Sequence, residues 1–227
     1  MTVDQDSASE APASQQRTTL PVLLAGWAAT LGDLPAFTVP GHRGESDGVS
    51  TYWSWRDLDA QVNRVAAMLA GRLNPDERVA LLASQGLEYL VGFLGALRAG
   101  VIAVPLFTPG LPEDTGRLRT VLGRCRPSLA LTTRAEQRAV TEFVGPYLAV
   151  IAIEDIPAAA PRDWPEPDPH SPAYLRCSSG SARAPAGVMV THADLVASAV
   201  GDGPDAVNWP PLFRDLGLVL STAGELS

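Results

Sequence analysis

Hydrophobic residues in this chain follow two alternating patterns, one typical of amphipathic helices and one typical of buried strands. The clearest helical stripe follows Ser54, a favourable N-cap residue, and is formed by Leu58, Val62, Val65 and Leu69. The Asn74-Pro75 pair is expected to end this helix, because the residue before a proline disfavours the helical conformation. The preceding stretch predicts one helix and two short strands, over 20–31, 37–39 and 51–53.

From residue 78 onward, short hydrophobic runs alternate regularly with amphipathic segments. The runs predict strands over 78–83, 101–105, 129–132 and 149–153. The segments between them predict helices over 87–98, 114–124 and 135–144, with Gly100 just beyond the first of these as a helix-ending residue. Strands joined by crossover helices form βαβ units, which build a mostly parallel sheet with flanking helices. The expected fold class is therefore α/β.

Changes in composition indicate where the chain divides. Six prolines between Pro157 and Pro172 are typical of an extended linker. After this linker we expect strands over 173–177 and 188–190 and a helix over 192–200, capped by Thr191. The expected organisation is a flexible tail, an α/β subdomain, a proline-rich linker and the start of an incomplete second subdomain with its own sheet, over 1–17, 18–156, 157–172 and 173–227.

One hydrophobic stretch, 89–107, is long enough to require comparison with a membrane span. It contains Arg98 near its middle as well as three glycines and Pro105. A spanning helix would place the guanidinium near the centre of the bilayer, which is costly. A helix followed by a buried strand explains the stretch better, so no membrane span is expected.

The composition narrows the possible functions. The chain has 227 residues, of which 46% are hydrophobic, so it can bury a sizeable core in one or two domains. Its net charge of −8 argues against a nucleic-acid partner, which requires a basic face. Cys125 and Cys177 lie outside any metal-ligand spacing and are interpreted as buried free thiols. The cysteine spacing therefore predicts no metal site. Free thiols, together with an N-terminus that does not resemble a signal peptide, favour a cytoplasmic location.

The segment between the strands at 173–177 and 188–190 carries the most chemical information. Residues 178–187 read SSGSARAPAG, with three serines, two glycines and one arginine. Small residues let backbone N–H groups turn towards an anion, and serine hydroxyls add donors, so one interpretation is a phosphate-binding loop. An ordinary hairpin loop is the alternative. A P-loop is excluded because it requires a lysine, and the chain contains none.

This segment also carries a resemblance. Residues 174–188, YLRCSSGSARAPAGV, resemble the phosphate-loop signature of adenylate-forming enzymes and are most similar to the fatty acyl-AMP ligase branch. Three further stretches lie in the order of that family's motifs. Residues 51–58 resemble its early tyrosine-containing motif, 78–105 resemble its second core motif, and 207–218 resemble the segment that the family writes as WLPLFHDMGL.

The resemblance implies ATP-dependent activation of a fatty acid to an acyl-adenylate, with Mg²⁺ present, followed by transfer to an acyl carrier protein or polyketide synthase. It implies that the loop binds the departing phosphates, through Ser178, Ser179, Gly180, Ser181, Arg183 and Gly187. The family's downstream histidine corresponds to Arg214, so that a fixed cation replaces a titratable ring. A surface arginine is the alternative for Arg214, no other catalytic residue is assigned, and no residue is assigned to a metal.

The sequence also departs from the family pattern. Ala182 and Ala184 replace two threonines, and each lost hydrogen bond to a charged group costs about 1.5–3 kcal/mol. The motifs for adenine, ribose and Mg²⁺ and the family's catalytic lysine are not found in the chain. We therefore expect a truncated, ligase-like chain that is inactive alone. Two alternatives stay open: a non-catalytic binding or regulatory module, and one half of a split ligase completed by a second chain with the remainder.

Overall fold

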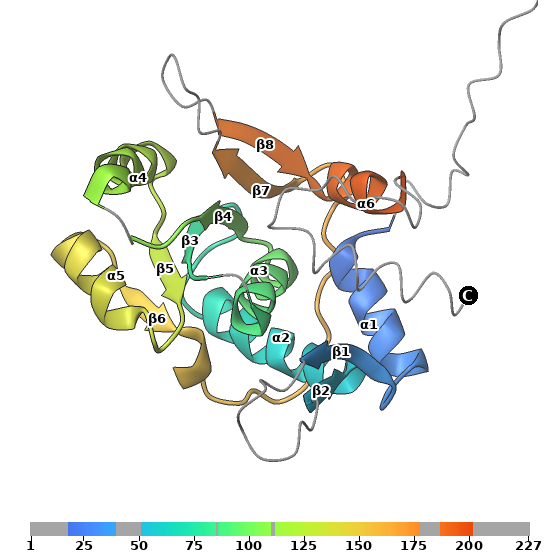
Figure 1. Cartoon of the computed structure of the whole chain (residues 1–227). Coiled ribbons are helices and arrows are strands. Elements are labelled where there is room, and N and C mark those ends of the chain that lie inside the picture. Colours follow the sequence, from blue (N-terminus) through green and yellow to red (C-terminus); the bar gives the residue numbers. More distant parts are fainter. Residues whose placement is uncertain (1–17, 40–50, 85, 110–111, 178–186, 202–227) are drawn as a thin grey trace, which may run out of the picture.

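The computed structural model describes residues 18–39, 51–84, 86–109, 112–177 and 187–201. Figure 1 shows their arrangement along the chain. The elements are α1 (Leu20–Thr30), β1 (Pro35–Val39), β2 (Thr51–Ser54), α2 (Trp55–Ala70), β3 (Arg78–Leu82), α3 (Leu87–Ala99), β4 (Ile102–Leu106), α4 (Pro112–Cys125), β5 (Leu129–Thr132), α5 (Gln137–Val144), η2 (Gly145–Tyr147), β6 (Val150–Ala152), η3 (Ile153–Asp155), β7 (Pro172–Cys177), β8 (Gly187–Thr191) and α6 (His192–Gly201).

The central feature is a six-stranded sheet with the order β6-β5-β3-β4-β7-β8. All neighbouring strands are parallel except β7 and β8, which form an antiparallel hairpin at one edge. In register, Val79 of β3 lies between Ala103 of β4 and Leu129 of β5. A separate two-stranded sheet is formed by β1 and β2. The predicted α/β class with a mostly parallel sheet and flanking helices is confirmed.

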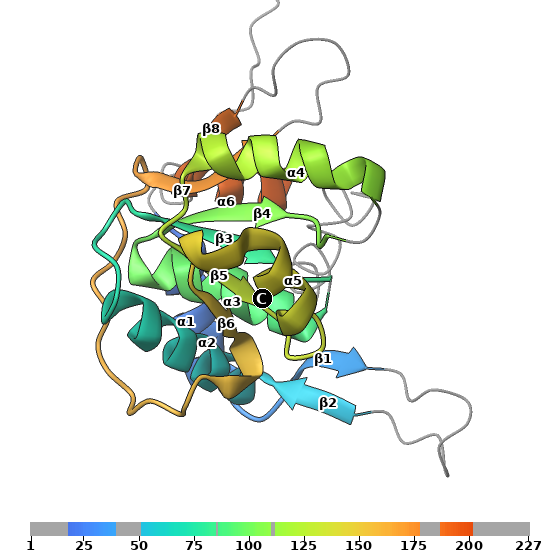
Figure 2. The ribbon, with the colours of Figure 1, turned by 90° about the vertical axis from the view of Figure 1, so that its left-hand side faces the viewer.

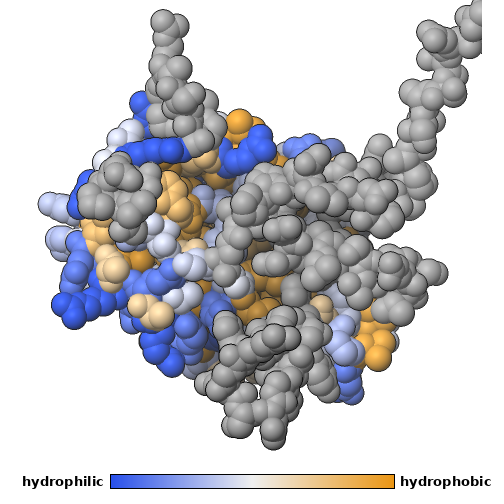
Figure 3. Space-filling model, viewed as in Figure 1, coloured by the Kyte–Doolittle hydropathy of each residue, from blue (hydrophilic) through white to orange (hydrophobic). Residues whose placement is uncertain are grey.

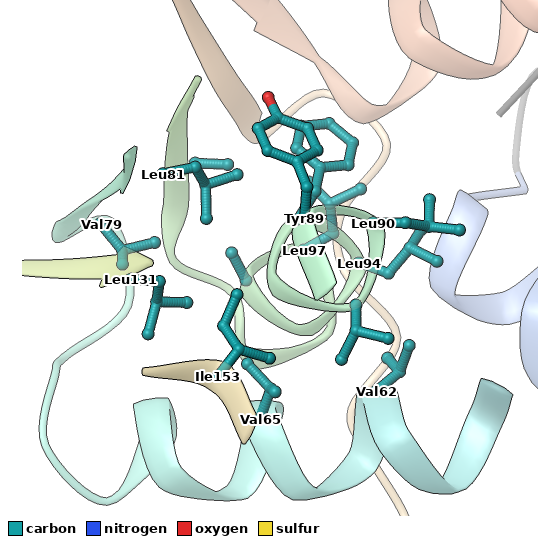
Figure 4. Packing of buried hydrophobic residues seen from close by; sticks show 14 of the residues in the cluster. Val62, Val65, Val79, Leu81, Tyr89, Leu90, Leu94, Leu97, Leu131 and Ile153 are labelled. Carbon is teal, nitrogen blue, oxygen red and sulfur yellow. The ribbon is translucent and has the colours of Figure 1, made fainter. Parts of the chain in front are cut away.

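The two faces of the sheet bury two hydrophobic clusters. Side chains alternate between faces along a strand, so Val79 and Leu81 join the cluster under α1, α2 and α3, whereas Ala80 and Leu82 join the cluster under α4 and α5. Figure 2 shows α4 and α5 on one side of the sheet and α1, α2 and α3 on the other. The larger cluster is shown in Figure 4, where Leu81 and Leu131 of the sheet point towards α3 and Val65 points towards it from α2.

Helices α2 and α3 pack closely because a glycine lies at their contact. A Cβ atom on Gly95 would lie 2.6 Å from Val65 Cγ1 and 2.7 Å from Val65 Cβ. Both distances are shorter than any relaxed carbon contact, so only glycine allows this approach of the two helices. The same interface contains Arg98, whose side chain is 4% exposed and forms an ion pair with Asp59 of α2 over 2.5 Å. The arginine that argued against a membrane span is thus buried and paired.

Most of the predicted elements are present, with some differences at their ends. Ser54 caps α2 in a capping box with Asp57, and Gly100 ends α3 with a φ of 71°. The expected end of α2 at Asn74-Pro75 is wrong, because the helix stops at Ala70 with Gly71 as its C-cap. The Gly71 N–H bonds back to the Ala67 carbonyl, which closes the last turn before the proline is reached.

The expectation that residues 173–177 begin a separate sheet is also wrong. Strand β7 pairs in parallel with β4, with Ala103 opposite Tyr174, and its partner β8 forms the sheet edge. Figure 1 shows the hairpin beside β4, so that the strands around the predicted phosphate loop extend the first sheet. Strands β6, β5, β3 and β4 leave one edge of the parallel sheet open at β4, and β7 covers that edge.

Residues 157–171 form no helix or strand, as predicted, whereas Pro172, the last residue of the predicted linker, is the first residue of β7. Residues 157–171 are also anchored to α2, and we call them the proline-rich strap. The buried Asn63 of α2 accepts a hydrogen bond from Trp164 Nε1 at 2.8 Å and donates to the Ala160 carbonyl at 3.1 Å. Beside it, the Arg64 guanidinium donates to the carbonyl oxygens of Ile153 and Ile156, at 2.6 and 2.7 Å. The strap therefore holds a defined path from β6 to β7.

Candidate functional site

The β7–β8 hairpin is the structural frame of the predicted phosphate loop. Its last described pair is Cys177 opposite Gly187, and residues 178–186 lie outside the described residues. Of the residues assigned to phosphate binding, Gly187 is described, at the start of β8. The other phosphate-binding candidates lie outside the described residues; they are Ser178, Ser179, Gly180, Ser181 and Arg183. Arg214, at the position of the family's histidine, also lies outside the described residues.

Gly187 is required by packing within the hairpin. A Cβ atom at this position would lie 2.9 Å from Leu175 Cδ1. Leu175 is buried and belongs to the cluster under α4 and α5, so its side chain has little freedom to move aside. The glycine therefore leaves room for the Leu175 side chain at the base of the loop.

A cavity of about 290 Å³ opens beside the base of the hairpin, between β7, β8 and the end of α4. It is lined by Arg78, Val121, Arg124, Cys125, Leu175, Cys177, Gly187 and Met189. The Arg78 guanidinium is held in place by donating to the Cys125 carbonyl at 2.8 Å. The cavity thus combines two guanidinium groups, two thiols and an apolar wall, next to the point where the predicted loop begins.

The two cysteines of the chain meet in this cavity. Cys125 Sγ and Cys177 Sγ lie 2.9 Å apart, with Cys125 buried and Cys177 half-buried. The hydrogen bond between the two sulfurs, together with the nearby cation of Arg78, lowers the pKa of the Cys177 thiol, whereas the same hydrogen bond and burial raise the pKa of Cys125. Both are free thiols, as expected, but their proximity was missed because a separation of 52 residues carries no local signal.

The chain passes from β8 of the hairpin into α6 at a buried histidine, His192. Thr191 caps α6, its hydroxyl accepting from the Asp194 N–H at 3.1 Å, as predicted. The next residue, His192, is 2% exposed, and its Nδ1 atom has no hydrogen-bond partner among the described residues. Burial lowers the pKa of His192 to about 4, although the carboxylate of Asp168 acts in the opposite direction. His192 is therefore a neutral, buried imidazole at neutral pH.

A second cavity, of about 460 Å³, lies between the strap and the end of α3. Its wall includes Arg98, Arg162 and Trp164, and the Arg162 guanidinium lies 4.1 Å from the centre of the Trp164 ring. Among the described residues no group of His, Cys, Asp or Glu side chains is arranged to hold a metal ion. Within the same residues, no helix is both long enough and apolar enough to cross a membrane.

The surface around the hairpin carries hydrophobic side chains. Val188 and Met189 of β8 are 45% and 39% exposed, and β8 has no further strand beside it among the described residues. Figure 3 shows the same face as Figure 1, where hydrophobic and hydrophilic residues are mixed in the region of β8 and hydrophobic residues gather around the centre of the molecule. Edge strands are the parts of a sheet that pair with further chain.

Comparison with known proteins gives a consistent picture. The family profile described as "AMP-binding enzyme" matches residues 24–226. The long-chain-fatty-acid–AMP ligase FadD32 of Mycolicibacterium smegmatis is 39% identical over 85% of this chain and 33% of its own length. The long-chain-fatty-acid–AMP ligase FadD26 of Mycobacterium marinum is 36% identical over 91% of this chain and 39% of its own length. The chain thus spans about a third of the length of these relatives.

Solved structures share the fold. The fatty acid AMP ligase from Legionella pneumophila superposes with a TM-score of 0.75 over 96% of this chain and 40% of that protein, at 22% identity. The nonribosomal peptide synthetase FmoA3 superposes with a TM-score of 0.72 over 95% of this chain and 23% of that protein, at 19% identity. Because the family profile matches most of the sequence, the chain belongs to the AMP-binding enzyme family.

Proposed function

We propose that this chain contributes the phosphate-binding loop and the first α/β sheet of a fatty acyl-AMP ligase. The observation that carries the proposal is the identity of 36–39% to FadD32 and FadD26, which extends over 85–91% of the chain. The β7–β8 hairpin supports it, because the predicted loop connects two strands that are anchored in the central sheet. In this role a fatty-acid carboxylate attacks the α-phosphorus of ATP and releases pyrophosphate.

The residues proposed to act in this reaction are those of the loop. Ser178, Ser179 and Ser181 would donate hydroxyl hydrogen bonds to the phosphates, and Arg183 would supply a fixed positive charge. When bound, ATP and Mg²⁺ supply the electrophilic phosphorus and its charge neutralisation. The acyl group would then pass to an acyl carrier protein or polyketide synthase.

We propose that activity also requires the parts of the ligase that correspond to the remaining length of these relatives. The chain contains no lysine, whereas the fatty acyl-AMP ligases that it resembles use a lysine from their small C-terminal domain. It also spans 33–39% of the length of its relatives. Alone, it is expected to bind Mg-ATP no more tightly than roughly millimolar, because both loop threonines are alanines here. Isothermal calorimetry with Mg-ATP measures this affinity directly.

The proposal is tested by ATP–pyrophosphate exchange with medium- and long-chain fatty acids. The chain is assayed alone and together with a polypeptide that carries the downstream two thirds of the FadD32 ligase of M. smegmatis. We expect no exchange from either part alone and fatty-acid-dependent exchange from the two together. Arg183→Ala should lower that exchange roughly ten- to hundred-fold, the equivalent of one lost charge-assisted hydrogen bond.

Arg176→Ala is the matched control, because Arg176 is an exposed arginine in the β7 stem just before the loop. Its exchange rate should equal that of the unchanged chain. Stable co-purification of the two polypeptides without exchange would contradict the enzymatic proposal and favour a binding or regulatory module. Exchange by the chain alone would show that the missing lysine and downstream motifs are not required.

A further inference from the structure

The closest sulfur contact in the described chain joins two elements that are far apart in sequence. Cys125 is the last residue of α4, Cys177 is the last residue of β7, and their Sγ atoms lie 2.9 Å apart. A disulfide bond requires an S–S distance of about 2.05 Å, so that less than about 1 Å of closure separates the thiol pair from a bonded pair.

The surroundings of the pair favour a reactive thiolate. Arg78 lines the same cavity and is fixed by its hydrogen bond to the Cys125 carbonyl, which holds a permanent positive charge near both sulfurs. Cys177 is half-buried and borders a cavity of about 290 Å³, which is large enough to admit a small hydroperoxide. A thiolate near a guanidinium and open to solvent is the kind of cysteine that reacts with oxidants.

The two thiols are not equivalent. The two Sγ atoms share one hydrogen bond in which either sulfur can be the donor, and this contact, with the charge of Arg78, lowers the pKa of Cys177. The same contact, together with burial, raises the pKa of Cys125. Cys125 is buried and Cys177 is only half-buried, so an oxidant in the cavity reaches Cys177 first. Cys177 is therefore the attacking thiolate of the pair, and Cys125 is the thiol that resolves the oxidised intermediate.

We propose that Cys125 and Cys177 form a reversible disulfide in response to hydroperoxides, which ties the end of α4 to the end of β7. In the first step the Cys177 thiolate attacks one oxygen of the hydroperoxide. An S–O bond forms and the O–O bond breaks, so that Cys177 becomes a sulfenic acid and the leaving oxygen takes up a proton as water or alcohol.

In the second step the Cys125 sulfur attacks the Cys177 sulfur. The S–S bond forms, the S–O bond breaks, and the departing hydroxide leaves as water with the proton of Cys125. The two thiols lose two electrons in total, and the hydroperoxide gains them. A dithiol reverses the reaction by thiol–disulfide exchange.

The disulfide would fix the position at which the chain leaves β7. In the reduced protein, α4 and the hairpin are joined across the cavity by noncovalent contacts. The bond would close a loop of 52 residues and restrict the unfolded chain. On the chain-entropy scale, closing a loop of this size raises the Tm of a protein of this length by about 5–15 °C.

The test uses the whole chain, reduced and then treated with one equivalent of hydrogen peroxide. We expect a monomer whose intact mass is lower by two hydrogens, a peptide map that joins Cys125 to Cys177, and a higher Tm in differential scanning fluorimetry. Dithiothreitol should restore the original mass and Tm. Disulfide-linked dimers as the main product, or both cysteines driven to sulfinic acid without a cross-link, would overturn the proposal.

Two serine variants test the roles of the two thiols. Under peroxide, Cys125→Ser should stop at a sulfenic acid on Cys177, which dimedone traps, and neither variant should show the rise in Tm. Cys177→Ser should react with peroxide at least ten-fold more slowly than Cys125→Ser, because Cys125 is the buried thiol. A faster reaction at Cys125 would show that the attacking and resolving roles are reversed and would contradict the mechanism as written.

Discussion

The ion pair between Arg98 and Asp59 gives the sharpest test of how α2 and α3 are held together. Arg98 is 4% exposed and donates through Nη2 to Asp59 Oδ1 at 2.5 Å, and through Nη1 to the Asp59 carbonyl at 3.3 Å. Asp59→Ala removes the carboxylate and leaves a guanidinium buried without its counter-charge. Breaking a buried pair in this way costs about 3–5 kcal/mol, because a buried charge loses its solvation without compensation.

Two features of the structure reduce this figure. The Asp59 side chain is 31% exposed, so that water reaches the site and partly solvates the guanidinium, and the Asp59 carbonyl still accepts one bond. We therefore expect a loss of about 2–4 kcal/mol in the free energy of unfolding, which lowers the Tm by about 5–12 °C. Asp59→Asn keeps an oxygen acceptor and should lose about half as much.

The assay is urea unfolding followed by circular dichroism, at low and at high salt. The matched control is Glu142→Ala, which breaks the ion pair to Arg138 on the surface of α5, where the two side chains are 66% and 91% exposed. This control should leave the unfolding free energy unchanged, since exposed pairs are screened by solvent. Equal and small losses for Asp59→Ala and Glu142→Ala would refute the inference that burial of Arg98 makes its partner essential.

Two further predictions concern packing and pH. Gly95→Ala should lower the free energy of unfolding by about 1–2 kcal/mol in urea unfolding, since the new methyl group collides with Val65 of α2. The control is Gly26→Ala on α1, which has open space around it and should raise the free energy of unfolding by about 0.5–1 kcal/mol. A Gly95→Ala variant that is more stable than the unchanged chain would contradict the close contact. The folded pKa of His192, about 4, lies below its unfolded value of about 6.5. Its burial therefore contributes stability above pH 6.5 that is lost as the pH falls towards 4, by about 1 kcal/mol per pH unit. His192→Gln should reduce the slope of the unfolding free energy against pH between pH 4 and 6.5, whereas His170→Gln, at an exposed histidine, should leave that slope unchanged. Identical slopes for the two variants would contradict the role of His192.

The sequence predicts the local elements well because each depends on residues that are close along the chain. Ser54 and the hydrophobic stripe behind it define α2 through a cap and a helical period, and Gly100 ends α3 in the left-handed conformation that glycine favours. The alternation of buried strands with helices is likewise a local signal, and it was sufficient to predict the parallel sheet.

The features that could not be predicted depend on pairs of residues that are far apart in the sequence. The partner of Arg98 lies 39 positions away, and the partner of Cys177 lies 52 positions away, with no periodic pattern to connect them. The placement of β7 beside β4 is of the same kind, because a strand pattern gives the strand but not its neighbour. The loop itself was assigned from its residue types and its resemblance, and those assignments stay predictions.

The proline-rich strap bears on the order in which this protein folds during synthesis. The edge of β4 is complete once Leu106 has been made, but its neighbour β7 begins only at Pro172, so that the pairing closes late and over a long stretch of chain. Trp164 and Ala160 precede β7 along the chain, so their contacts with Asn63 can form before β7 has left the ribosome. Once these contacts have formed, β7 is separated from its anchored neighbour by a few residues instead of by the whole of α4, β5 and α5. The shorter loop makes the pairing of β7 with β4 faster. It also shortens the time for which the unpaired edge of β4 is exposed to aggregation.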